Sequence, residues 1–190
     1  MGKKSEIVDK VEKKMDSKFL VDLTIKARCV YLQGVIDEPL VKQVVEELLL
    51  LDRINHKPIT LFINSPGGLV TGTLSIIDTM EGIASEVHTL VVGHACSGAA
   101  LISVCGKTRK MSKRSIWMIH PMAGGVIDYH SFMKDKMEGL DILDSSIDGI
   151  IKKYTKLPVI MRKKSKTGEI WLNASQCKRY KVIDEIITKL

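Results

Sequence analysis

Strand-like stretches that alternate with helical patterns constrain the fold of this chain more than any other feature. β-Branched and apolar residues gather at 23–26, 29–36, 59–63, 87–92 and 115–119, and helical patterns cover 38–54, 73–83 and about 98–105. In such an order, successive strands lie side by side and the helices return the chain across the sheet. The sequence therefore predicts an α/β fold with a mostly parallel sheet covered by helices.

The helix at 38–54 has both a start signal and an apolar stripe. Asp37 is placed to cap it, and Pro39 falls in the first turn, where its missing N–H costs no hydrogen bond. The spacing predicts an inward stripe of Leu40, Val44, Val45, Leu48 and Leu49.

A longer helical pattern covers about 129–154. Its apolar residues recur every three or four positions: Phe132, Met133, Met137, Leu140, Leu143, Ile147, Ile150, Ile151 and Tyr154. One small core does not need so long a helix, so we expect it to protrude and to pack part of its stripe on another subunit. The alternative is a helix that lies wholly on its own sheet.

The chain has 190 residues and no internal repeat or Gly/Ser-rich linker. Residues 1–18 are densely charged and predict an N-terminal arm, which leaves 19–190 as a single domain.

The net charge of +7 is a local feature, because residues 152–181 hold 10 Lys or Arg and one acidic residue, Glu169. Only three aromatic residues accompany them, fewer than a stacking surface for nucleic acid requires. We interpret the segment as a solvated face or a protein-partner surface, and we expect no nucleic-acid partner.

The four cysteines form no CxxC pair and no zinc-type cluster with His, so we expect no disulfide framework, metal or other cofactor. The uncharged run at 87–106 contains two His and three Gly, which favours a buried strand–turn–helix over a membrane span. A cytoplasmic or other reducing intracellular compartment is the expected location.

Three groups with possible chemistry follow predicted strands: the Gly67-Gly68 turn, Ser97 and His120. Because parallel sheets gather functional groups where their strands end, these residues are expected to meet. Ser97 is the candidate nucleophile and His120 the candidate base, with His94 as a rival base three residues before Ser97. Each signal alone also fits a packing serine or an ordinary polar strand end.

The combined pattern resembles a known family. INSPGG at 63–68, GHACSGAA at 93–100 and MIHPMAGG at 118–125, followed by a long helix and EIWLNASQCKRYKVIDEI at 169–186, are similar to the ClpP family, the proteolytic subunits of ATP-dependent Clp proteases.

The resemblance implies a crotonase-like spiral fold with the long helix as a handle that joins two heptameric rings. It also implies a serine endopeptidase that cleaves unfolded polypeptides and works with an AAA+ unfoldase. Ser97 would be the nucleophile, His120 the general base, and the amides of Gly68 and Gly98 the oxyanion hole.

Three positions depart from the family pattern. Glu169 stands where the family usually has the Asp of the triad, with Asp184 as a fallback carboxylate. Gly98 stands where the family usually has Met, and the usual Gln after the catalytic His is absent, because Pro121 follows His120 directly. Glu169 and Gly98 motivate one alternative, a ClpP-like structural or regulatory subunit with little activity. A second alternative is a crotonase-type acyl-CoA enzyme, because that fold also uses backbone oxyanion holes.

Overall fold

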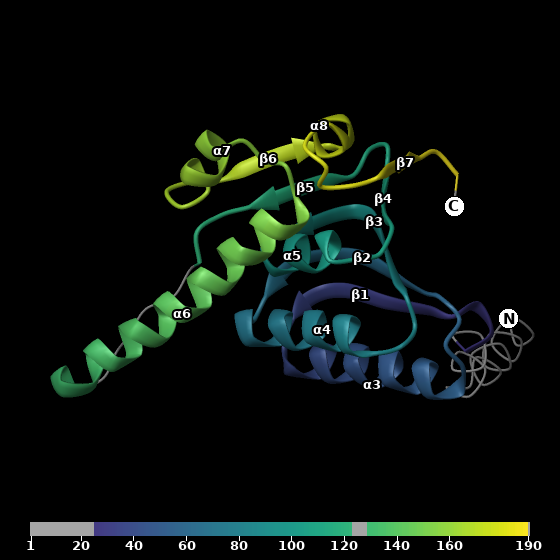
Figure 1. The fold of residues 1–190 in the computed structure, drawn as a ribbon, viewed down its shortest axis with the longest axis horizontal. Coiled ribbons are helices and arrows are strands. Elements are labelled where there is room, and N and C mark those ends of the chain that lie inside the picture. Colours follow the sequence, from purple (N-terminus) through teal and green to yellow (C-terminus); the bar gives the residue numbers. More distant parts are fainter. Residues whose placement is uncertain (1–24, 123–128, 190) are drawn as a thin grey trace, which may run out of the picture.

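The computed structural model describes residues 25–122 and 129–189. Its elements, in chain order, are β1 (Cys29–Ile36), α3 (Glu38–Ile54), β2 (Ile59–Gly68), α4 (Val70–Gly82), β3 (Val87–Cys96), α5 (Gly98–Val104), β4 (Arg109–Ser112), β5 (Ile116–Ile119), α6 (His130–Tyr154), α7 (Val159–Lys164), β6 (Ile170–Asn173), α8 (Ala174–Arg179) and β7 (Glu185–Ile187) (Figure 1). The alternating order up to β5 agrees with the prediction from the sequence.

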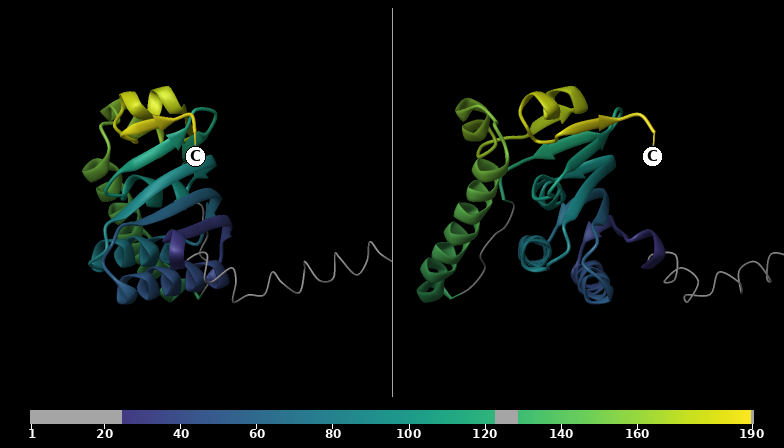
Figure 2. Two further views of the ribbon diagram at one scale, coloured as in Figure 1. Left: turned by 90° about the vertical axis from the view of Figure 1, so that its right-hand side faces the viewer. Right: turned by 45° about the vertical axis from the view of Figure 1, so that its right-hand side comes forward.

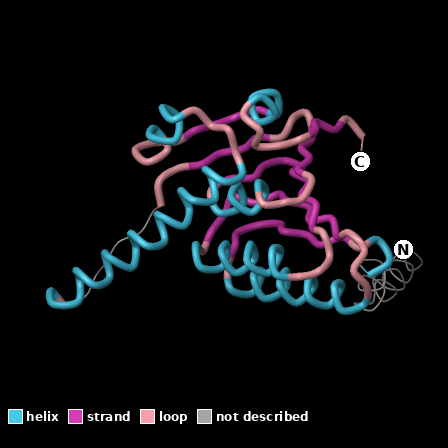
Figure 3. The backbone as a smooth tube through the Cα atoms, in the orientation of Figure 1, coloured by secondary structure: helices cyan, strands magenta, loops and turns pink. Residues whose placement is uncertain are grey.

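The sheet is mostly parallel, as predicted. Its main path is β1-β2-β3-β4-β7, and every neighbouring pair along this path is parallel. Off the path, β5 pairs in parallel with β3, and β6 pairs with β5 in the antiparallel direction. Figure 3 shows the strands in magenta and the helices in cyan.

The sheet divides along β3. The first part of this strand, Thr89–Val91, pairs with β4, and the last part, His94–Cys96, pairs with β5. Gly93 lies between the two parts with φ +96°, a backbone conformation that favours glycine. The division gives β5 and β6 their own place beside the end of β3, which is where the site described below lies.

α3 begins and ends as the sequence predicts. The Asp37 side chain accepts a hydrogen bond from the amide of Leu40 at 3.0 Å and caps the helix. The predicted stripe is right for Val44 and Leu48 but wrong for Leu49, which is exposed, whereas Leu51 is buried instead.

The core lies between the strands and the helices that cover them. α3 and α4 pack against each other, and α5 lies against β2 and β3. The largest fully buried side chains are Trp117, Leu32, Ile36, Leu48, Leu51, Ile59, Leu61, Ile63, Ile76, Ile102, Met111 and Leu172.

α6 covers 25 residues and extends away from the body of the protein, so its first half does not lie on the sheet (Figures 1 and 2). Phe132, Met133 and Met137 are exposed on this half, and Ile151 is buried near the other end. The alternative of a helix lying wholly on its own sheet is therefore wrong.

The first described residues differ from the prediction. Residues 25–27 are helical, so the strand expected at 23–26 is wrong for its described part. The charged arm at 1–18 lies outside the described residues. In the part of the chain that the structure describes, no helix combines the length and apolar character needed to span a membrane.

Candidate active site

Ser97 lies in the sharp turn between β3 and α5. Its φ of 54° and ψ of −123° are a combination that a residue with a side chain rarely adopts. The Ser97 amide donates a hydrogen bond to the carbonyl of Met118 at 2.8 Å, which ties the turn to β5. Strained residues persist where the surroundings hold them, and a strained strand-to-helix turn is also how some hydrolases expose a serine nucleophile.

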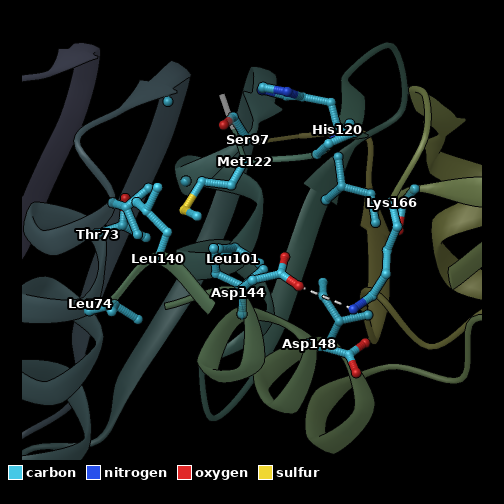
Figure 4. A pocket seen from close by; sticks show the side chains of 18 of the residues that line it. Thr73, Leu74, Ser97, Leu101, His120, Met122, Leu140, Asp144, Asp148 and Lys166 are labelled. Carbon is cyan, nitrogen blue, oxygen red and sulfur yellow. Dashed lines mark hydrogen bonds and ion pairs between the residues drawn. The ribbon is translucent and has the colours of Figure 1, made fainter. Parts of the chain in front are cut away.

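His120 directly follows β5, and the sheet brings it near the serine turn. Cys96 and Met118 are partners in the parallel β3–β5 register, so both strands end at the same place. The ring of His120 reaches across the pocket in the direction of Ser97 (Figure 4). The side chains of Ser97 and His120 are not joined by a hydrogen bond in the described structure, and contacts of this kind often tighten only when substrate binds.

A cavity of about 790 Å³ is lined by Ser97, His120, Gly68 and Gly98 together. Leu74, Leu101, Met122 and Leu140 give the cavity an apolar side, and Thr73 lies beside them (Figure 4). The cavity is large enough for several side chains of a peptide, and Ser97 and His120 both lie in its wall.

Neither of the two glycines proposed for the oxyanion hole has room for a side chain. A Cβ on Gly68, which has φ +157°, would lie 2.3 Å from the carbonyl oxygen of Ile36. A Cβ on Gly98 would lie 2.2 Å from Oγ1 of Thr73. Gly98 is also the first residue of α5, so its amide has no acceptor within the helix and is free to bind an oxygen atom.

Comparison with known proteins gives the same family as the sequence motifs. The Clp protease family model matches residues 12–190. The chain belongs to the Clp protease family. It is 31% identical over 167 residues to the ATP-dependent Clp protease proteolytic subunit of Carsonella ruddii (strain PV), which covers 87% of this chain and 86% of that protein. It is 34% identical over 171 residues to proteolytic subunit 1 of Rhodopirellula baltica (strain DSM 10527 / NCIMB 13988 / SH1), covering 88% and 75%.

Glu169 is not among the residues that line the cavity, although the sheet brings it close. The antiparallel β5–β6 register pairs Ile119 with Ile170, and one more step in this register sets His120 opposite Glu169. Burial first, and then the charge of Glu169, raise the pKa of the Cys96 thiol next to Ser97. In this Clp family chain, the Glu169 carboxylate accepts a hydrogen bond from the indole of Trp171 at 2.6 Å.

The two other candidates from the sequence lie elsewhere. Asp184 is bound to Arg109, with Oδ1 2.6 Å from Nη2 and Oδ2 3.0 Å from Nε. These bonds lower the pKa of Asp184. His94 lies within β3, paired with Ile116, and is not among the residues that line the cavity. Neither Asp184 nor His94 is therefore brought to Ser97.

The far end of the cavity holds charged residues that the motifs did not indicate. Lys166 Nζ lies 3.2 Å from Asp144 of α6, and Asp148 points into the same space (Figure 4). Lys152 Nζ approaches Asp148 at 2.6 Å and lowers its pKa. Three of the ten basic residues at 152–181 thus pair with carboxylates of α6 and α4: Lys152 with Asp148, Lys166 with Asp144, and Lys153 with Glu81.

A metal site is not evident among residues 25–122 and 129–189, since no three His, Cys, Asp or Glu side chains there are grouped to bind an ion. The four cysteines are free thiols.

Proposed function

We propose that this Clp family protein is a serine endopeptidase that cleaves unfolded polypeptides through an acyl-enzyme intermediate. The observation that carries the proposal is the strained turn that holds Ser97 in a cavity wall shared with His120. The membership of the Clp protease family supports the same reaction.

In the proposed reaction, Oγ of Ser97 attacks the carbonyl carbon of the scissile peptide bond while His120 accepts the hydroxyl proton. The amides of Gly68 and Gly98 stabilise the negative charge on the former carbonyl oxygen. His120 then gives its proton to the leaving amine, and a water molecule activated by the same imidazole hydrolyses the acyl-enzyme.

Glu169 is proposed as the group that orients His120 and stabilises its protonated form. Continuing the β5–β6 register by one residue supports this role, because directly opposed residues have Cβ atoms about 4.5–5.5 Å apart. The longer Glu side chain spans such a gap from a backbone slightly farther away than an Asp would need.

We further propose a homo-oligomer of stacked heptameric rings, with α6 as the handle between them, and an AAA+ unfoldase that delivers the substrate. The names of the relatives include ATP dependence and a proteolytic subunit, which supports a separate ATPase partner. Because such partners need ATP, we expect the cytoplasm or another reducing intracellular compartment.

The direct test compares wild type with Ser97→Ala in the hydrolysis of a fluorogenic peptide and in labelling by a fluorophosphonate probe. Loss of the nucleophile is expected to lower kcat by about 10³-fold or more and to abolish labelling. Ser75→Ala, at an exposed serine of α4, is the matched control and is expected to behave like wild type. Equal labelling of wild type and Ser97→Ala would refute the proposal. A wild-type protein that assembles but neither cleaves nor labels would instead favour the inactive structural subunit.

A further inference from the structure

The indole of Trp171 and the carboxylate of Glu169 form a hydrogen bond at the exposed edge of the site. Nε1 of Trp171 donates to Oε2 of Glu169 at 2.6 Å. The two residues are two positions apart at the start of β6, so their side chains lie on the same face of the strand. Trp171 is 53% exposed, whereas its neighbours Ile170 and Leu172 are buried and fix the strand in the core. The indole therefore adds little to the core and bonds the carboxylate instead.

A carboxylate has two oxygen atoms, and each accepts hydrogen bonds. The bond from Trp171 engages Oε2 and leaves Oε1 for a second donor. Continued by one residue beyond the Ile119–Ile170 pair, the β5–β6 register places His120 opposite Glu169, which makes the imidazole N–H the candidate for that donor.

A glutamate needs such a tether more than an aspartate does. Its side chain has one more rotatable bond, so holding the carboxylate in one place costs more conformational entropy. Glu169 is exposed, and packing around it does not supply the restraint. The hydrogen bond from Trp171 supplies this restraint, because the strand that carries the indole is fixed by its buried residues Ile170 and Leu172.

We propose that Trp171 is a positioning residue, which holds Oε2 of Glu169 so that Oε1 meets the imidazole of His120. This inference rests on the proposed function, and it gives Glu169, the third member of the proposed triad, a fixed position. Trp171 acts through Glu169 and does not touch the reacting atoms.

The test is a double-mutant cycle on kcat and KM with a fluorogenic peptide. Trp171→Phe keeps an aromatic ring and removes the N–H that bonds Glu169, together with part of the indole. The variant is expected to lower kcat about 3- to 10-fold, with KM and the thermal midpoint nearly unchanged. The expected loss is small because water competes for an exposed hydrogen bond and because Trp171 acts on the reaction only through Glu169. In the Glu169→Ala background, the same Trp171→Phe change is expected to have no further effect on kcat.

Three results would overturn the inference: an unchanged or higher kcat in Trp171→Phe, an equal loss with and without Glu169, or an unchanged kcat in Glu169→Ala. A merely structural Trp171 would give the second result together with a lower thermal midpoint. In the third case, probe labelling of Ser97 still decides the proposed function separately.

Discussion

Thr73 packs directly against Gly98 beside the serine turn. Thr73 is buried, and its hydroxyl donates to the carbonyl of Leu69 at 2.9 Å, which fixes the side chain where a Cβ on Gly98 would lie. Gly98→Ala is expected to destabilise the protein by about 1–3 kcal/mol, since the clash is with a fixed side chain in a packed region. Urea denaturation followed by far-UV circular dichroism measures this loss.

Removing the Thr73 side chain is expected to relieve the clash in Gly98→Ala. Thr73→Ala removes Oγ1 and leaves the nearest remaining Thr73 atom, Cβ, at 3.3 Å from the added Cβ, so the double variant is expected to recover most of the stability lost in Gly98→Ala. Gly139→Ala is the matched control: that glycine lies in α6 with open space around it, and an alanine there is expected to stabilise the helix slightly. Strictly additive losses in the double variant would contradict the pairing.

Ser97 and His120 were predictable from the sequence because each follows an apolar strand, and parallel strands bring their ends together. Thr73 and Lys166 were not, because they reach the cavity from helix and loop positions whose orientation depends on tertiary packing. The bond between Glu169 and Trp171 also escaped prediction, since a spacing of two residues matters only once the segment is known to be a strand.

At the level of elements, a polar cluster joins the start of β1 to the end of α3. Arg28 is buried, and its guanidinium donates to the carbonyls of Leu51, Asn55, Lys57 and Pro58. Ser85 adds the link to α3, because its amide and its hydroxyl both donate to Asp52 at 2.8 Å. These bonds hold the loop between α3 and β2.

The cluster makes stability depend on pH. Hydrogen bonds from Ser85, and from His56 nearby, lower the pKa of Asp52 to about 2. A carboxyl group in the unfolded chain has a pKa of about 3.9, so the folded state favours the ionised form. The stabilisation is therefore complete above about pH 5 and is lost as the pH falls from about 4 towards 2.

We expect Asp52→Asn to be less stable than wild type at pH 7 and the two proteins to converge between about pH 4 and 2. Urea denaturation at a series of pH values measures the difference. Ser85→Ala removes the main donor and is expected to converge with wild type over the same interval. A difference that stays constant down to pH 2 would show that Asp52 does not carry the pH dependence.

Long elements were easier to predict than short ones. The bounds of α3 and the existence of α6 follow from many periodic positions and a cap. β4, β6, β7, α7 and α8 have three to six residues each, too few for a period to emerge, so periodicity in the sequence does not predict them. The antiparallel pairing of β6 with β5 depends on where the end of α6 returns the chain, which is a property of the assembled fold.

At the scale of the whole molecule, the exposed half of α6 has two unlike faces. Met133 and Met137 lie one turn apart on the predicted stripe and are 39% and 51% exposed, whereas Ile142 lies on the opposite face of the helix and is 67% exposed. If the stripe packs on a second copy of the chain, carboxylates placed there would be buried without partners, which is costly.

Met133→Glu/Met137→Glu is expected to give smaller assemblies than wild type, and Ile142→Glu, with the same chemistry on the other face, is expected to leave the size unchanged. Sedimentation velocity at matched concentrations measures this. Equal sizes for all three proteins would refute the role of the stripe, and an equal reduction by Ile142→Glu would show that both faces of α6 take part in the assembly.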